Sequence, residues 1–434
     1  MDQKIMEKRT NIIYRPQKSQ WQNILKRERK SSKNDYGTGL IVENIEKGGD
    51  KALLSYLKIF DSLDIEASEL EVKPEEFKEA ELSISEELKA AVDCAISNVR
   101  KFHAAQKSQD IAIETMPGVV CRQKNVPINR VGLYIPGGTA PLFSTVIMLA
   151  VPAQIAGCKE VILCTPVGKS GKVAPEVLYC AKLCGVTRVF KAGGPAAIAA
   201  MAYGTETIPA ADKIFGPGNS YVTTAKQIVS KEICAIDMPA GPSEVMILAD
   251  STADPKFITA DFLAQLEHGK ESQAVLVTTS ENLALETLNE LDRQMATLSR
   301  QEYIAESLGR SVIVVLDTQE QMVDMANEYA PEHLIICTEN YRETAEKITN
   351  AGSIFLGNYT PESAGDYASG TNHTLPTGGW AKSFSGVNLS SFTKKITIQE
   401  ITREGLQGLG PVIETMANAE GLDAHANSVK VRLG

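Results

Sequence analysis

The sequence lacks the features that would place the chain in a membrane or on a nucleic acid. No apolar run in its 434 residues approaches the roughly 20 that span a bilayer, and the start, MDQKIMEKRT, has no apolar signal core. Positive charge is also scarce, because 44 Lys and Arg stand against 54 Asp and Glu, and the formal net charge is -10. Nucleic acids and anionic membranes both need a basic surface. We therefore expect a cytoplasmic protein with neither partner; an organelle form that has lost a transit segment is the alternative.

The sequence has no CxxC cysteine pair and only five histidines. A CxxC pair is the usual start of a thiolate zinc or redox site, and most of the eight cysteines fall in apolar segments. We expect them to be reduced core residues. The five histidines can be weighed one by one; they are His103, His268, His333, His373 and His425. For His103, in a long helical segment, we expect an exposed or half-buried surface role.

The length and the hydrophobic pattern predict an α/β fold with more than one core. From Val131 onward, apolar strands recur every ~25 to 30 residues with helices between them, which is typical of parallel sheets. The predicted architecture is two Rossmann-like parallel-sheet units with an N-terminal helical region and a C-terminal helical tail. Its predicted boundaries are an arm at 1–24, a helical part at 25–130 continued by an α/β unit at 243–377, a second α/β unit at 131–242, and a tail at 378–434. We place the ligand site between the units, at the carboxyl ends of strands.

The segment 236–273 joins a Gly/Pro-rich turn, an apolar strand and a two-faced helix. The spacing predicts an apolar stripe formed by Ile258, Phe262, Leu263 and Leu266. On the polar face Gln265 and His268 lie one turn apart, so both can reach one ligand, and Gly269 ends the helix. The alternative is an ordinary solvated face with a histidine in the last turn.

A metal set and a proton-transfer pair are both available. Imidazole nitrogens and carboxylate or amide oxygens suit a borderline cation such as zinc. Three distant segments offer such donors, namely Gln265, His268, Asp366 and His425. Spacing alone leaves their convergence open. Glu332 and His333 lead directly into the apolar strand LIIC, where two proton acceptors could face one substrate; a surface turn is the alternative.

Three glycine-rich turns precede predicted helices: IPGGTAP (135–141), AGGPAA (192–197) and FGPGNS (215–220). Helix N-termini favour phosphate groups. None of the turns fits G-x-G-x-x-G, and no acidic residue stands at the offset expected for a ribose hydroxyl. Tight turns between strands and helices would produce the same glycines, so the dinucleotide pattern is weak by itself.

An ordered series of motifs runs along the chain: VGLYIPGG, KIFGPGN, DMPAGPSE, EHG, APEHL, GDYASGTNH with LPTGG, and a C-terminal E-x4-H. Single motifs of this size occur by chance, but the whole ordered series does not. Through it the chain resembles histidinol dehydrogenase over nearly its whole length. The resemblance implies a zinc-containing, NAD-dependent homodimer that oxidises L-histidinol through L-histidinal to L-histidine, in the last steps of histidine biosynthesis.

The resemblance also implies roles for residues. It places zinc on Gln265, His268, Asp366 and His425, and proton transfer on Glu332 and His333. Besides the zinc ligands, the implied substrate contacts are Ser243, His333 and Glu420. Glu420 and His425 lie in the tail, which in such enzymes reaches the site of the other subunit. The metal would belong to the unit at 243–377 and NAD to the unit at 131–242.

For NAD, the resemblance implies contacts from Tyr134 and Asn219. The third contact departs from the family pattern, because GGPAAIAA stands here where the family usually has GGAQAIAA. Ala196 therefore occupies a glutamine position and cannot donate an amide hydrogen bond, which contributes on the order of 1 kcal/mol.

Other functions fit parts of the sequence. The nearest is a paralogous zinc- and NAD-dependent dehydrogenase of another small alcohol such as a sulfonated diol. Ser243, His333 and Glu420 weigh against it, because they suit an amino alcohol with an imidazole. A zinc hydrolase or a non-catalytic binding module would leave the nicotinamide contacts or the Glu332 and His333 pair without a role.

Overall fold

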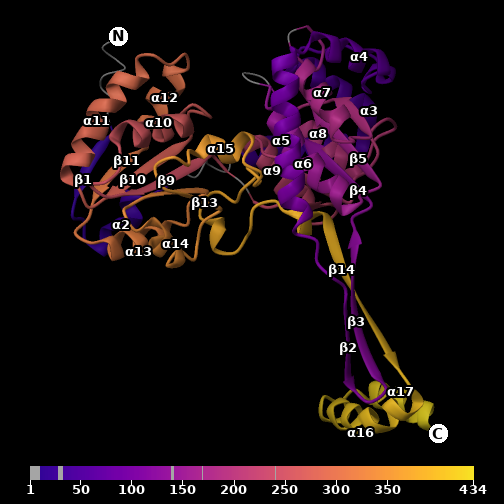
Figure 1. Cartoon of the computed structure of the whole chain (residues 1–434). Coiled ribbons are helices and arrows are strands. Elements are labelled where there is room, and N and C mark those ends of the chain that lie inside the picture. The colour runs from indigo at the N-terminus through magenta and orange to yellow at the C-terminus, as the bar shows by residue number, and fades with distance from the viewer. Residues whose placement is uncertain (1–9, 28–32, 138–140, 169, 240) are drawn as a thin grey trace.

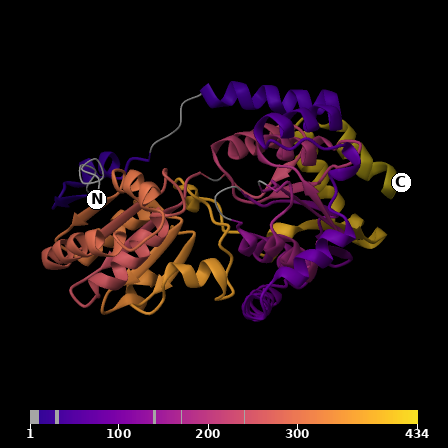
Figure 2. The same ribbon diagram turned by 90° about the horizontal axis from the view of Figure 1, so that it is seen from above.

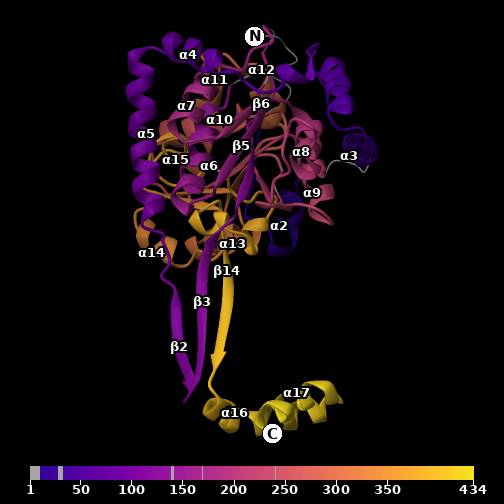
Figure 3. The same ribbon diagram turned by 90° about the vertical axis from the view of Figure 1, so that its right-hand side faces the viewer.

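The computed structural model describes residues 10–27, 33–137, 141–168, 170–239 and 241–434 (Figure 1). Within them, apolar runs and βαβ connections build two parallel sheets, and an antiparallel stalk projects away from both (Figures 1 and 3). No helix of this described part combines the length and apolarity needed to cross a membrane. Residues 1–9 of the predicted arm lie outside the described residues.

One sheet has six parallel strands, buried on both faces. Their order is β1 (Asn11–Tyr14), β11 (Val312–Val315), β10 (Gln273–Thr278), β9 (Glu244–Ala249), β12 (His333–Cys337) and β13 (Ser353–Leu356). One face packs on α10 (Pro255–Leu266), α11 (Glu281–Met295) and α12 (Gln301–Leu308). The other face packs on α2 (Lys18–Ile24), α13 (Gln319–Tyr329) and α14 (Tyr341–Glu346). The predicted stripe on α10 is fully within this core.

The second sheet has five parallel strands in the order β6 (Arg188–Lys191), β5 (Glu160–Thr165), β4 (Arg130–Tyr134), β7 (Lys213–Phe215) and β8 (Ala235–Ile236). One face carries α4 (Pro74–Ser83), α5 (Glu86–Ala104), α6 (Phe143–Ala156) and α7 (Pro175–Leu183). The other carries α3 (Lys33–Phe60), α8 (Gly194–Tyr203) and α9 (Ser220–Ser230). All five strands were predicted from sequence. Figure 2 shows the two sheet units side by side.

Two predicted boundaries are wrong. The helical residues 33–104 pack on the five-stranded sheet, in the cores that contain Leu133 and Tyr134, and not on the unit at 243–377. Residues 11–24, expected as a separate arm, add β1 to the six-stranded sheet and bury Trp21 beneath it. An amphipathic pattern shows which face of a helix is buried, but it does not show which sheet that face packs against. The chain crosses from the five-stranded to the six-stranded sheet between β8 and β9, close to the predicted boundary at 242/243, and β9 pairs with β10 and β12.

The stalk was not predicted from sequence. It is an antiparallel sheet of β2 (Ile111–Met116), β3 (Val119–Pro127) and β14 (Thr393–Ile401), with α16 (Arg403–Ala419) and α17 (Asp423–Leu433) at its far end (Figure 3). Many apolar side chains of these elements are exposed in the single chain, namely Ile111, Ile113, Met116, Ile396, Ile398, Ile401, Val412, Met416 and Val431. The remaining elements are α15 (Glu362–Tyr367) and the short helices at Ala67–Glu69, Trp380–Lys382 and Leu389–Phe392.

Cysteines and one histidine complete the core. All eight cysteines are free, and five are buried, which confirms most of them as reduced core residues. His103, by contrast, is 0 % exposed on α5, so the expected surface role is wrong. Its Nδ1 lies 2.9 Å from the Val99 carbonyl, and its Nε2 is buried without a hydrogen-bond partner among the described residues.

His103 should make folding stability depend on pH. Burial lowers the pKa of His103, and only the Val99 carbonyl opposes this, so the fold favours the neutral ring. The stabilisation is complete above the unfolded pKa of about 6.5 and is lost as pH falls toward the folded pKa, at up to about 1.4 kcal/mol per pH unit. We expect urea unfolding of His103→Leu to show a smaller loss of stability between pH 7.5 and 5.5 than the parent chain. Equal losses in the two proteins would contradict this.

Candidate active site

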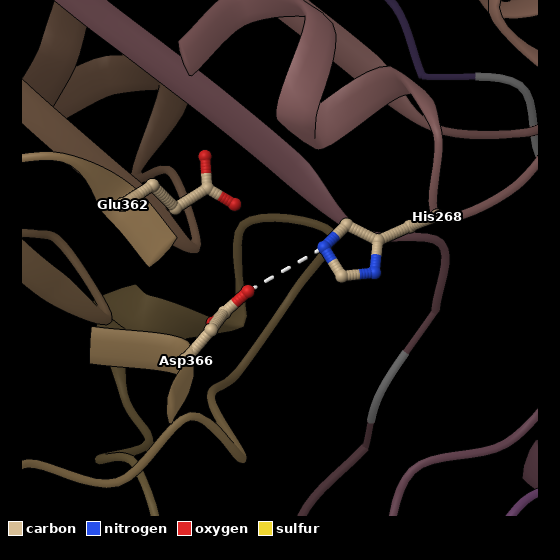
Figure 4. Close-up of side chains that lie close together, drawn as sticks. All are labelled: His268, Glu362 and Asp366. Carbon is tan, nitrogen blue, oxygen red and sulfur yellow. Dashed lines mark ion pairs between the residues drawn. The ribbon is translucent and has the colours of Figure 1, made fainter. Parts of the chain in front are cut away.

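Four polar side chains meet beside the six-stranded sheet. Gln265 lies in the last turn of α10 and His268 just beyond that helix, and α15 supplies Glu362 and Asp366. His268 Nε2 lies 3.5 Å from Asp366 Oδ2. Ligand atoms of His268, Glu362 and Asp366 all lie within 4.8 Å of one another, and Figure 4 shows these three side chains pointing toward a common space. The predicted convergence of His268 with Asp366 is thus present in one chain.

Local structure explains this arrangement. Helix α10 ends at Leu266, so Gln265 lies in its last turn and His268 in the turn just beyond it. Gln265 is 0 % exposed, so the alternative of a solvated polar face is wrong for it. The Gln265 amide fits its surroundings when its nitrogen donates to Glu362 Oε1 at 2.8 Å and to the Glu244 carbonyl at 3.3 Å. In that orientation the amide nitrogen is a donor to these groups, so the oxygen is the candidate ligand atom.

Glu332 and His333 adjoin this cluster at the start of β12, and both are buried, which excludes the alternative of a surface turn. His333 Nδ1 lies 3.7 Å from Glu332 Oε2 and 3.6 Å from Glu362 Oε1, while His333 Nε2 lies 3.7 Å from Asp366 Oδ1. The backbone N–H of Glu244 donates to Glu332 Oε2 at 2.9 Å. Both side chains can therefore act on one bound molecule.

The electrostatics of the cluster favour a cation. Burial raises the pKa of Glu332 and of Glu362 well above the ordinary range, and nearby carboxylates raise them further. Burial also lowers the pKa of His333 to about 4. Asp366 differs, because the His268 hydrogen bond and nearby histidines outweigh burial and lower its pKa. A divalent cation would reverse the cost of ionising the carboxyl groups, and nitrogen plus oxygen donors suit zinc. The residues present therefore fit a metal ion.

The position of the site relative to the strands differs from our expectation. Glu244 and His333 are the first residues of β9 and β12, so on this unit the site lies at the amino ends of strands. The segment after Asp366 connects the site to the other unit, because His373 Nε2 lies 3.1 Å from Thr145 Oγ1 on α6. Chain direction explains the difference: β9 follows directly from the crossing and starts at this edge.

The tail residues do not reach this cluster within one chain. Glu420 and His425 lie at the end of α16 and in α17, beyond the stalk, far from α10 and α15 (Figure 1). Ser243 immediately precedes Glu244 and so adjoins the site through the backbone. A single copy therefore holds three of the four predicted zinc ligands and lacks the fourth.

Sequence reasoning missed two members of the site, Glu362 and His373. Glu362 stands one helical turn before Asp366, an i, i+4 pair that points both carboxylates to one side. His373 is half-buried, and its Nδ1 lies 2.8 Å from the Asp366 carbonyl. The spacing of the two acids could have indicated Glu362. Nothing local indicated His373, because a loop brings it back.

The expected cofactor residues lie at the carboxyl ends of the five-stranded sheet. Tyr134 ends β4, and its hydroxyl accepts a hydrogen bond from the Gly194 N–H at 3.1 Å. Asn219 caps α9 by accepting from the N–H groups of Tyr221 and Val222. Ala196 is buried in the first turn of α8. Of the three glycine-rich turns, two head α8 and α9; part of the first, residues 138–140, lies outside the described residues.

Two parallel-sheet units and a partly buried cluster of imidazole, amide and carboxylate groups define an α/β enzyme with a candidate metal centre. The sequence comparison gives the family: the histidinol dehydrogenase model matches residues 25–433. The chain is 55% identical to the histidinol dehydrogenase of Bacteroides thetaiotaomicron over 423 residues, 97% of this chain and 98% of that one. It is 51% identical to the Aliivibrio fischeri enzyme over 395 residues, 91% and 89% of the two chains. The chain belongs to the histidinol dehydrogenase family of oxidoreductases.

A solved structure supports the same assignment. The crystal structure of histidinol dehydrogenase from Elizabethkingia anophelis matches with a TM-score of 0.94 and 50% sequence identity, over 98% of each chain. The match covers both sheet units and the stalk. The unusual projecting sheet is therefore part of the fold that the two proteins share.

Proposed function

We propose that this chain is a zinc- and NAD-dependent histidinol dehydrogenase that oxidises L-histidinol through L-histidinal to L-histidine. The observation that carries the proposal is the convergence of His268, Glu362 and Asp366, with Gln265 held by Glu362, beside the buried Glu332 and His333. Family membership supports the reaction, and the site supplies the groups that the reaction needs.

Zinc would be held by Gln265, His268 and Asp366 of one chain, with His425 of a second copy as the fourth ligand. Bound there, it would supply a positive charge that orients the imidazole and amino nitrogens of the substrate. Ser243 and Glu420 would complete the substrate contacts. Glu362 accepts a hydrogen bond from the Gln265 amide nitrogen at 2.8 Å and so would direct the amide oxygen to the metal.

His333 would take the hydroxyl proton in the first oxidation. Its low pKa, caused by burial, leaves the ring unprotonated at neutral pH, and its Nε2 has no hydrogen-bond partner among the described residues. Glu332 would then take a proton from the water that attacks the aldehyde. The Glu244 N–H fixes this carboxyl group at 2.9 Å, next to His333.

Two NAD molecules in succession would each accept one hydride, and the bound NAD would lie along the carboxyl ends of the five-stranded sheet. Tyr134 and Asn219 would contact it, and the N-termini of α8 and α9 would favour its phosphates. The buried Ala196 offers no side-chain amide at the third position. We expect one contact fewer, and weaker cofactor binding, than in a glutamine-bearing relative.

A homodimer would complete each site through the tail. The apolar side chains of β2, β14 and α16 that are exposed in the single chain would be covered by the second copy. Crossing tails would bring Glu420 and His425 of one copy to α10 and α15 of the other.

The direct test is formation of NADH from histidinol. We expect two NADH per histidinol, loss of nearly all activity after chelation, and recovery on adding back Zn²⁺. Metal analysis of the same samples shows whether activity follows bound zinc. Full turnover in a preparation free of metal would overturn the zinc assignment, and a failure to reduce NAD with histidinol, at full zinc content, would overturn the substrate assignment.

A further inference from the structure

Arg27 lies in the N-terminal segment, just after α2, but its side chain contacts residues next to Glu332 and His333. Its side chain is only 25% exposed. Nε donates to Glu244 Oε2 at 2.5 Å, and Nη2 donates to Glu244 Oε1 at 2.8 Å and to the Tyr329 carbonyl at 2.8 Å. The guanidinium carbon also lies 3.6 Å from the centroid of the Tyr329 ring. The planar guanidinium group makes two hydrogen bonds to one carboxylate and stacks on an aromatic ring. A lysine side chain cannot reproduce this geometry.

The two residues that Arg27 contacts, Glu244 and Tyr329, are both linked directly to the catalytic pair. The backbone N–H of Glu244 donates to Glu332 Oε2, and the Glu244 carbonyl lies 3.4 Å from His333 Nδ1. Tyr329 ends α13, and three residues later the chain reaches Glu332. Between them Ala330 has a φ of +52°, a left-handed backbone conformation that costs energy for alanine. One guanidinium therefore ties together the two backbone segments that set the positions of Glu332 and His333.

The Glu244 carboxylate depends on this contact. Glu244 is 2% exposed, and its other donors are the Gly378 N–H at 3.1 Å and a longer contact from the Tyr329 hydroxyl at 3.4 Å. Without Arg27 it would be a buried carboxylate with no cationic partner among the described residues, which is strongly unfavourable. We expect the start of β9 to shift in response. The rest of β9 is held by ladders to β10 and β12 and does not need the ion pair.

We propose that Arg27 is a positioning residue, which holds Glu332 and His333 in place through Glu244 and the Tyr329 backbone. The proposal rests on the proposed function, because it assigns Arg27 to the proton-transfer step of that reaction. It gives the N-terminal segment a part in catalysis although that segment carries none of the groups that touch substrate.

The test compares Arg27→Gln with Arg27→Lys. For Arg27→Gln we expect kcat for histidinol to fall by about tenfold to a hundredfold, the loss typical of a small displacement of reacting groups. KM for histidinol and NAD should change by less than about threefold, and zinc content should stay that of the parent, because Arg27 is not among the metal or cofactor groups. Arg27→Lys should recover part of kcat, since it keeps the charge and loses the fork.

Arg15→Gln is the matched control. Arg15 lies in the same segment and pairs with Glu281 and Asp317 on the same unit, but at an exposed position away from Glu244. Its kcat should equal that of the parent chain. A double-mutant cycle of Arg27→Gln with Glu244→Gln should be strongly non-additive in kcat, because both changes break one ion pair.

Three results would overturn the proposal: equal kcat in Arg27→Gln and Arg15→Gln, a loss carried by KM or zinc content, or additive effects in the cycle. If Arg27→Gln does not fold, Arg27→Lys and Glu244→Gln carry the same comparison. Failure of the proposed function is distinguishable, because the parent chain itself would then not reduce NAD with histidinol.

Discussion

Two inactive variants should regain activity when they share a dimer. We expect Asp366→Ala and His425→Ala each to lose nearly all histidinol oxidation, at least about a thousandfold, because each removes a proposed ligand of the metal that would orient the substrate. In a mixed dimer, the His425→Ala copy keeps an intact cluster on α10 and α15, and the Asp366→Ala copy supplies it with an intact tail. One complete site is rebuilt, and the other carries both defects.

The measurement uses co-expression with two different affinity tags, so that tandem purification isolates the mixed dimer. We expect about half of the parent activity per dimer, with about one zinc instead of two, because one of two sites is whole. The control pairs a chain that carries both Asp366→Ala and His425→Ala with the parent chain. This dimer also has one intact cluster and one intact tail, but both belong to the same copy. If the tail acts within its own chain, that control would be active and the mixed dimer inactive.

The geometry favours the crossed arrangement. Within one described chain, His425 lies on α17 beyond the stalk, while His268, Glu362 and Asp366 already share one space (Figures 1 and 4). The apolar residues exposed along the stalk, such as Ile396 and Ile398, would be costly to leave in water. A partner that covers them would also set the tail of each copy beside the other body.

The sequence predicted the parts of the fold whose pattern is local. Buried parallel strands such as β9 and β12 are short apolar runs between helices, so their period and spacing identified them. The stalk strands β2 and β14 have no buried residue in one chain, so they carried no such pattern. The buried faces of the helices in 33–104 could also be predicted, but the sheet on which they pack depends on contacts between residues distant in sequence.

The site follows the same division. Gln265 lies in the last turn of α10 and His268 just beyond it, so spacing was enough to pair them. Glu332 and His333 are adjacent, and the following strand predicted a buried edge. His373 and Arg27 reach the site through a loop and an N-terminal segment, contacts that no periodicity encodes. The proposed metal ligands needed the family resemblance, because they come from distant segments.

Glu332→Gln should separate the two oxidations. The amide keeps the shape of the side chain and can still accept the Glu244 N–H hydrogen bond at the position of Oε2, so the site should stay folded. It cannot take a proton from water, so attack of water on the aldehyde should slow by about a hundredfold to ten-thousandfold, the usual contribution of a general base. The first oxidation, in which His333 takes the hydroxyl proton, should lose much less.

Single-turnover experiments with histidinol and with histidinal measure the two steps separately. For Glu332→Gln we expect a first NADH at nearly the parent rate, then a slow second phase, and the same slow rate when histidinal is added directly. His333→Asn should instead slow the first phase as well, since the group that accepts the alcohol proton is gone. Both variants should retain zinc, because neither residue is among the proposed ligands. Equal loss of both steps in Glu332→Gln would remove its role in water activation and leave His333 as the base for both oxidations.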